Sequence, residues 1–130
     1  MEQEKKQQLR RHADAEEPQR IEEYRDLEDQ LEIYRLIFDS IHNGSMVTDA
    51  EGFVTHFNKP YGDFLGLDPA AQIGKHCTEV IENSRMHLVA KTGVPEINQT
   101  HLIKGQKMVV QRIPIKKDGK GYVFEPVQAA

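Results

Sequence analysis

The chain has 130 residues, of which 38% are hydrophobic, so it is long enough for one domain with a small core. Its net charge of −4 lies in residues 1–35, which hold eleven acids and seven bases, whereas residues 36–130 hold ten of each. A neutral globular part excludes direct nucleic-acid binding, because phosphate contacts need a concentrated basic face. One cysteine excludes an internal disulfide, and no run of eighteen apolar residues could span a membrane. We therefore expect a cytoplasmic protein.

Residues 1–20 are polar, and we expect a flexible or frayed segment in which Pro18 marks a break or a helix start. Residues 21–43 show the pattern of an amphipathic helix. Its apolar residues recur at alternating spacings of three and four, which is the seam of a coiled coil. The seam consists of Tyr24, Leu27, Leu31, Tyr34, Phe38 and Ile41. The pattern predicts a homodimer, and the alternative is a helix that packs only on its own domain.

Residues 44–126 are expected to form the core domain, and residues 127–130 a C-terminal tail. Two short strands joined by an Asp-Ala-Glu-Gly turn come first, then a helix that Asn58 begins and Gly66 ends. Further short helices follow, and Gly93 ends the last of them. Three strands close the domain, predicted at 97–103, 108–115 and 121–124. This order predicts an α+β fold.

Within this region, residues 78–83 read Thr-Glu-Val-Ile-Glu-Asn and residues 85–87 read Arg-Met-His. These motifs, together with Phe57-Asn58 and Phe64-Leu65-Gly66, resemble the PAS sensory domains of bacterial activators that work with sigma-54-type RNA polymerase. The resemblance covers about residues 30–124. It implies a five-stranded antiparallel sheet with helices on one face around a ligand pocket, and signalling to an output domain.

Two features depart from this family pattern. The ATPase and the DNA-binding domain that follow in such activators do not occur in this chain, so we expect either an excised domain or a free-standing sensor. The last strand and the two residues after it, 121–126, read Gly-Tyr-Val-Phe-Glu-Pro, where the family tends to have small and β-branched residues. The end of the sheet and the linker after it therefore depart from the family pattern.

The resemblance implies a core pocket for an unidentified small molecule. We expect it to be lined by Val47, Phe57, Phe64, Leu65, Ile73, Val80, Met86, His87, Val110 and Arg112. If Arg112 points inward, its fork of donors suits a carboxylate ligand, with Arg85 or His87 as a second contact. If Arg112 points outward, it pairs with an acid on the N-terminal helix such as Glu32.

No catalytic or metal-binding set is expected, and no cofactor is identified. The histidines do not form the i, i+4 pair that a helical metal site favours. Cys77 and His76 are adjacent on a short turn, where side chains usually point apart, so we expect a core cysteine. Haem-binding PAS domains take their axial ligand from the helix of His87, although further from its end. A haem sensor and a ligand-free dimerisation domain remain the alternatives to a small-molecule sensor.

Overall fold

The computed structural model describes the backbone of residues 2–130 and the side chains of residues 17–130. The chain divides into two units, Met1–Ile37 and Phe38–Ala130. The first unit is formed by helix α1 (Glu2–Ser40), whose last residues belong to the second unit. Among the described helices, none has the length and apolar character needed to cross a membrane.

Pro18 lies inside α1, so the predicted break or helix start at this residue is wrong. Proline removes one hydrogen-bond donor, but the flanking sequence is rich in glutamate, glutamine and arginine, which favour the helix. The helical backbone also covers most of the segment that was expected to be frayed. The side chains of residues 1–16 lie outside the described residues.

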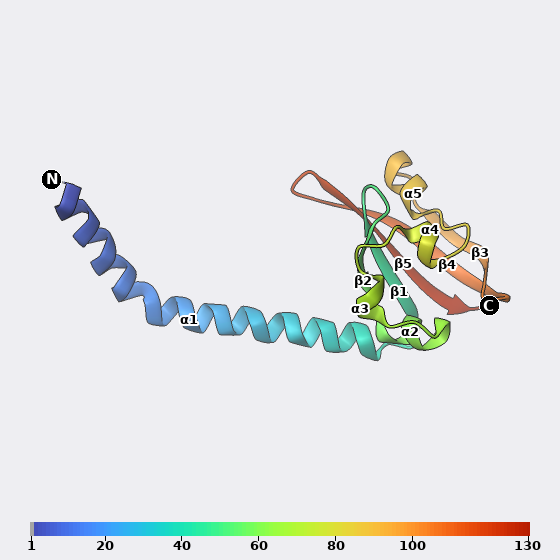
Figure 1. Cartoon of the computed structure of the whole chain (residues 1–130), viewed down its shortest axis with the longest axis horizontal. Helices are drawn as coiled ribbons and strands as arrows, with labels where there is room; N and C mark the ends of the chain where they lie inside the picture. Colours follow the sequence, from blue (N-terminus) through green and yellow to red (C-terminus); the bar gives the residue numbers. More distant parts are fainter. Residues whose placement is uncertain (1) are drawn as a thin grey trace. The chain divides into compact units, whose positions relative to one another are not determined.

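The second unit is built on a five-stranded antiparallel sheet, as the resemblance implied, with the strand order β2-β1-β5-β4-β3 (Figure 1). The strands are β1 (Gly44–Asp49), β2 (Val54–Phe57), β3 (Glu96–Ile103), β4 (Gln106–Lys117) and β5 (Lys120–Ala129). Four short helices connect β2 to β3 and lie on one face of the sheet. They are α2 (Lys59–Leu65), α3 (Pro69–Gln72), α4 (Cys77–Val80) and α5 (Met86–Thr92).

Strand β5 continues beyond its predicted end, so the C-terminal tail expected at 127–130 is wrong for all but the last residue. Pro126 has no N–H to give to a sheet, which argues against a strand at this position. The strand nevertheless continues, since Val127 is buried and pairs with Gly44 of β1 and with Val110 of β4. Burial on a central strand outweighs the lost donor at one position.

Asn58 fixes the start of α2, as its N-cap position predicts. Its Oδ1 accepts hydrogen bonds from the backbone N–H groups of Tyr61 (3.2 Å) and Ser45 (2.8 Å). Its Nδ2 donates to the carbonyl oxygens of Phe38 (2.9 Å) and Asn43 (3.0 Å). One buried amide therefore joins the end of α1, the start of β1 and the start of α2.

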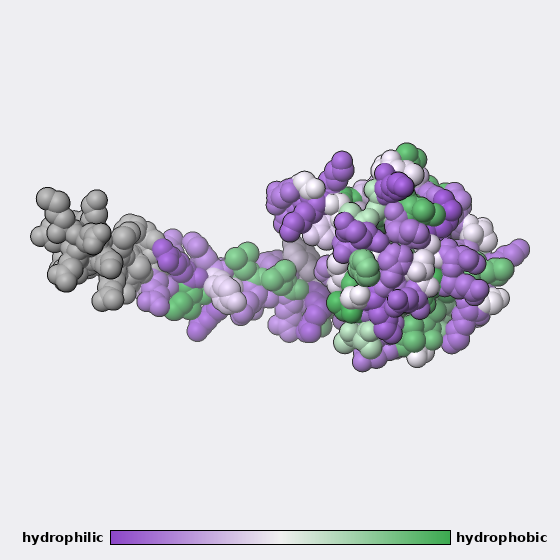
Figure 2. Space-filling model, turned by 45° about the horizontal axis from the view of Figure 1, so that its top comes forward, coloured by the Kyte–Doolittle hydropathy of each residue, from purple (hydrophilic) through white to green (hydrophobic). Residues whose placement is uncertain are grey.

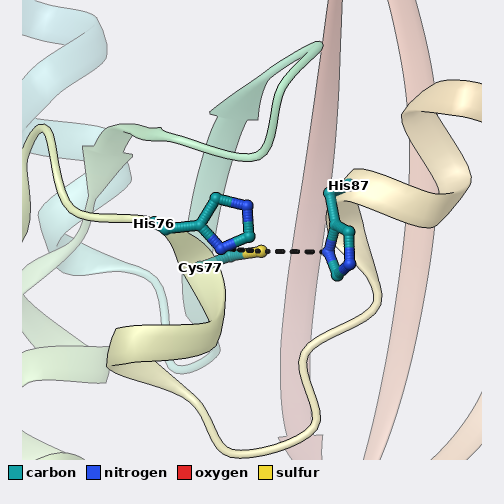
Figure 3. Close-up of side chains that lie close together, drawn as sticks. All are labelled: His76, Cys77 and His87. Atoms are coloured by element: carbon teal, nitrogen blue, oxygen red, sulfur yellow. Dashed lines mark hydrogen bonds between the residues drawn. The ribbon is translucent and has the colours of Figure 1, made fainter.

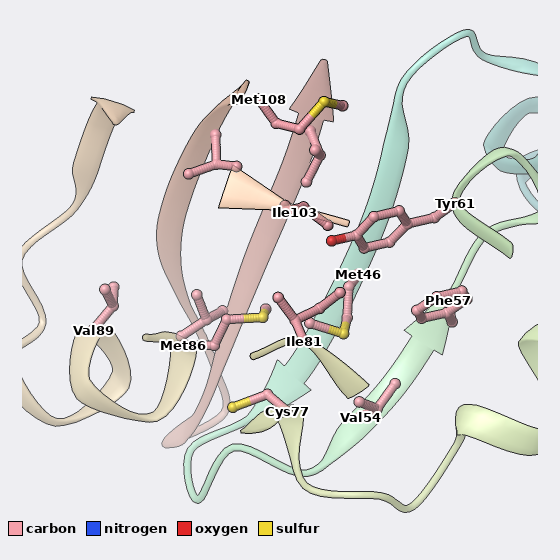
Figure 4. Close-up of a cluster of buried hydrophobic side chains, with 13 residues drawn as sticks. Met46, Val54, Phe57, Tyr61, Cys77, Ile81, Met86, Val89, Ile103 and Met108 are labelled. Carbon is pink, nitrogen blue, oxygen red and sulfur yellow. The ribbon is translucent and has the colours of Figure 1, made fainter. Parts of the chain in front are cut away.

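The core lies between the helices and the sheet (Figure 4). Strand alternation turns Met46, Val110, Val123 and Val127 toward the helices. The full set of buried hydrophobic residues is Met46, Val54, Phe57, Tyr61, Cys77, Ile81, Met86, Val89, Ile103, Met108, Val110, Val123 and Val127. The Tyr61 side chain points into this cluster, with its ring stacked on Phe57 at 5.0 Å between ring centroids.

Candidate functional site

Arg112 of β4 points into the domain and is 2% exposed, which decides between the two orientations that the sequence allowed. Its Nε donates to Glu125 Oε2 at 2.8 Å, and its Nη1 donates to Glu96 Oε1 at 2.9 Å. Its Nη2 donates to His101 Nδ1 at 2.8 Å. Because this nitrogen of His101 accepts, the other one carries the proton and donates to the Glu82 carbonyl at 3.0 Å. The guanidinium is therefore held by three strands: β3, β4 and β5.

The network continues outward through Glu96 to Arg85, the residue before α5. Arg85 holds Glu96 through Nε (3.1 and 3.2 Å) and Nη2 (2.9 Å), and its side chain is half exposed. The Arg85 hydrogen bond is the main reason why the pKa of Glu96 is lowered, and Arg112 adds to it against the opposing effect of burial. Glu96 is thus the link between a buried cation and a surface cation.

The pKa values of two buried groups, the Glu125 carboxyl and the Tyr61 phenol, are raised, whereas that of Glu96 is lowered. Burial raises the pKa of Glu125, and the guanidinium of Arg112 only partly opposes this effect. Burial also raises the pKa of Tyr61, and the nearby Glu125 raises it further, so Tyr61 stays a neutral phenol. Its hydroxyl has no hydrogen-bond partner among the described residues. The interior therefore holds the hydrogen-bonded pair of Arg112 and Glu125 and a Tyr61 hydroxyl without a partner among the described residues.

Removing the charge of Glu96 should make the domain less sensitive to acid. Since the folded pKa of Glu96 is below its unfolded value, its stabilisation is present above the unfolded pKa and is lost as pH falls through the folded pKa. We expect Glu96→Gln to lower the free energy of unfolding by about 1–3 kcal/mol at pH 7. Urea denaturation should show this difference shrinking from about pH 5 downward. The exposed Glu82→Gln should change little, and a pH-independent difference for Glu96→Gln would contradict the assignment.

The predicted pocket residues do not all face the interior. Phe57, Met86, Val110 and Arg112 are buried there. Phe64, Leu65 and Val80 pack against the core as partly buried residues. Two predictions are wrong: Ile73 is 48% exposed, because it follows the last residue of α3, and Val47 pairs with Phe124 on the opposite face of the sheet from Met46.

Two surface hollows lie beside the partly buried residues. A hollow of about 320 Å³ is lined by Phe64, Tyr61 and Met108, among others. A second, of about 430 Å³, is lined by Leu65, Val80, Leu102 and neighbouring residues. Neither is lined by Arg112, whose three guanidinium nitrogens each donate to a protein group.

His87, the last of the predicted pocket residues, lies instead in a cluster with His76 and Cys77 (Figure 3). Cys77 Sγ is 3.6 Å from His87 Nδ1 and 3.9 Å from His76 Nδ1. Cys77 is buried, as expected, but the prediction that it points away from His76 is wrong, because the chain turns into α4 at His76. Burial, and then the neighbouring His76 and Arg85, lower the pKa of His87, which favours a neutral imidazole.

Sequence reasoning missed all three hydrogen-bond partners of Arg112, which are Glu125, Glu96 and His101. The signal for Glu125 was its place in the unusual last strand, where alternation with Val123 and Val127 puts a carboxylate on the buried face. Glu96 and His101 are two strand residues whose pairing with β4 depends on an irregular register between Glu96 and Gln99. Spacing alone does not reveal such a shift.

The model of the PAS fold matches residues 32–128, which is most of the chain. The chain belongs to the PAS family. This PAS domain is 31% identical over 91 residues to the sensor protein CitS of Halalkalibacterium halodurans, a match over 68% of this chain and 17% of CitS. The chain thus spans about a sixth of that relative, a protein of signal transduction.

Solved structures show the same fold. The DhaR(N)–DhaL complex of E. coli contains a chain that matches with a TM-score of 0.68 and 16% identity, over 82% of this chain and 38% of that one. The PAS domain of Bordetella pertussis BvgS matches with a TM-score of 0.60 and 23% identity, over 78% of this chain and 87% of that one. PAS domains are sensory modules, and at these identities the structures support the fold alone.

Proposed function

We propose that this PAS domain is the signal-sensing and homodimerising module of a bacterial signal-transduction or transcription-regulatory protein, acting in the cytoplasm. Its output domain would be of the kind found in sigma-54-dependent activators, such as an ATPase, which the motifs at 78–83 and 85–87 support. The proposal assigns no catalytic role to this chain. The observation that carries it is an apolar stripe on α1.

The stripe consists of Tyr24, Leu27, Leu31 and Tyr34, whose exposed fractions are 64%, 63%, 67% and 63%. Figure 2 shows hydrophobic side chains along α1 among strongly hydrophilic ones. The heptad spacing of the stripe is that of a two-helix seam, so a second copy of the same helix can cover it. Phe38 continues the seam and is partly exposed, whereas Ile41 follows the end of α1 at Ser40, earlier than the predicted helix end at residue 43. Covering a stripe of this size would give a substantial part of the free energy of dimerisation.

Sensing would use the interior of the domain. Glu96 is the one acid of the Arg112 network that is also partly exposed, so a small carboxylate could replace it on Arg112. The unpartnered Tyr61 hydroxyl offers a further hydrogen bond in the core. Such a ligand would change the dimer only as far as it binds two arrangements of the domain with different affinity.

A second candidate is a constitutive dimerisation domain without a ligand. The observation that favours it is that Nε, Nη1 and Nη2 of Arg112 all have protein acceptors. A buried arginine in this state is already neutralised, and it needs no external anion.

Native mass spectrometry of freshly purified protein tests these proposals together. We expect a dimer that carries the additional mass of a small organic acid. A dimer of bare mass would favour the ligand-free candidate, and the mass of haem would identify the haem-based alternative. A bare monomer at all accessible concentrations would overturn the role of the α1 stripe.

A further inference from the structure

The cluster of His76, Cys77 and His87 has the composition of a transition-metal site. Its three ligand atoms, one from each residue, lie within 4.8 Å of one another. Thiolate and imidazole are the ligands that zinc prefers in proteins, whereas magnesium and calcium prefer oxygen. The expectation of no metal site rested on spacing within one helix, but these ligands come from the start of α4 and the start of α5.

The distances agree with a tetrahedral centre. With a Zn–S bond of about 2.3 Å and Zn–N bonds of about 2.0–2.1 Å, sulfur and nitrogen ligands lie about 3.6 Å apart. Cys77 Sγ is 3.6 Å from His87 Nδ1 and 3.9 Å from His76 Nδ1. The two sulfur–nitrogen separations therefore suit one ion, and rotations of the side chains that bring the two imidazole nitrogens closer together would complete the site.

The hydrogen bonds of His76 determine which of its ring nitrogens is unprotonated and can bind a metal. Its Nε2 donates to the Glu51 carbonyl at 3.1 Å, so Nδ1 carries the lone pair that faces Cys77. At present this lone pair accepts hydrogen bonds from the Thr78 hydroxyl at 2.7 Å and from the Thr78 backbone N–H at 3.3 Å, the N-cap contact of α4. Metal binding replaces both hydrogen bonds, and the carbonyl of Glu51 keeps the ring in place.

The turn between β1 and β2 closes over the cluster. A methyl group added at Gly52 would lie 2.7 Å from His76 Nε2 and 2.7 Å from His87 Cβ. The Gly52 carbonyl also accepts a hydrogen bond from the Cys77 N–H at 2.8 Å. The thiol is thus buried on the inner side, while the two partly buried imidazoles give an ion access from outside.

We propose that His76, Cys77 and His87 bind a zinc ion through Nδ1, Sγ and Nδ1, with the fourth position left to water or an external ligand. The thiol proton passes to solvent on binding, so the site contributes one thiolate and two neutral imidazoles. The ion would join the start of α4 to α5, which packs against β1, β4 and β5. The site is separate from the Arg112 network and does not depend on dimerisation.

The test is a titration of the untagged, chelator-treated full chain with Co²⁺, which gives tetrahedral thiolate sites visible ligand-field bands and a thiolate charge-transfer band. We expect one Co²⁺ per chain, displaced by Zn²⁺, and a melting temperature that rises with Zn²⁺. His87→Ala should weaken Co²⁺ binding by at least about 100-fold. The matched control is the exposed His56→Ala, which should bind as the unmodified chain does.

Cys77→Ser gives the second readout, since it should abolish the charge-transfer band while circular dichroism reports whether the domain remains folded. If Cys77→Ser does not fold, His87→Ala decides, because His87 is partly exposed. Absence of the charge-transfer band in the unmodified chain would overturn the proposal. Equal Co²⁺ affinity of His87→Ala and His56→Ala would overturn it as well.

Discussion

Replacing Arg112 by methionine is expected to lower the free energy of unfolding by about 3–5 kcal/mol, because it leaves a charged group unpaired in the interior. The unpaired group is Glu125, which is 1% exposed and loses its 2.8 Å hydrogen bond. Urea denaturation at pH 7 measures the loss. Arg85→Met is the matched control: its side chain is half exposed, so we expect a loss of about 1 kcal/mol or less.

The double variant Arg112→Met with Glu125→Leu should recover most of that stability. Apolar side chains of similar size often replace a buried ion pair without net cost, since neither charge then needs to be desolvated. The single Arg112→Met variant should also gain stability relative to the unmodified chain as pH falls, because burial raises the pKa of Glu125 and protonation removes the unpaired charge. An Arg112→Met loss no larger than that of Arg85→Met would contradict the structural role of the network.

Replacing both Leu27 and Leu31 by serine is expected to convert the proposed dimer into a monomer. Each leucine contributes about 1.5–3 kcal/mol when it is fully buried, and a symmetric seam loses two from each subunit. Light scattering coupled to size exclusion measures the mass. The control replaces Asp26 and Asp29 by serine; both lie on α1 outside the predicted seam and are exposed.

The control should remain dimeric, and circular dichroism should show that the sheet domain of both variants is folded. If the Leu27→Ser/Leu31→Ser double variant and its control form dimers of equal affinity, the seam does not hold the subunits together. The half-exposed face of the sheet, which carries Val109, Ile113 and Phe124, would then be the surface to examine.

Local signals in the sequence predicted much of the fold. Asn58 does cap α2, and Gly66 and Gly93 do end helices in the left-handed region, with φ values of 70° and 69°. These predictions are correct because capping depends on a few neighbouring residues. Alternation in β4 puts Val110 and Arg112 on one face, and both are buried, but the sequence left the orientation of Arg112 open.

The candidate sites were harder to predict, because their residues meet through pairing between distant segments. Glu125 lies opposite Arg112 only after β4 and β5 have found their register, and His87 reaches Cys77 only after α5 has packed. Sequence spacing gives only a weak indication of the register between β4 and β5, and almost none of how α5 packs against the cluster. The signal that was overlooked in β5 is Glu125, a carboxylate on the same strand face as Val123 and Val127. A carboxylate on a buried face indicates a cationic partner.

Asn58 has a consequence for how a signal can pass through this PAS domain. The amide uses both of its donors and both lone pairs of its oxygen, so it has no spare capacity to exchange partners while the domain stays folded. The last turn of α1 therefore cannot rotate or slide without displacing β1 and the start of α2. Because such coupling is reciprocal, the pairing of two helices would bias the sensory core as strongly as the core biases the helices.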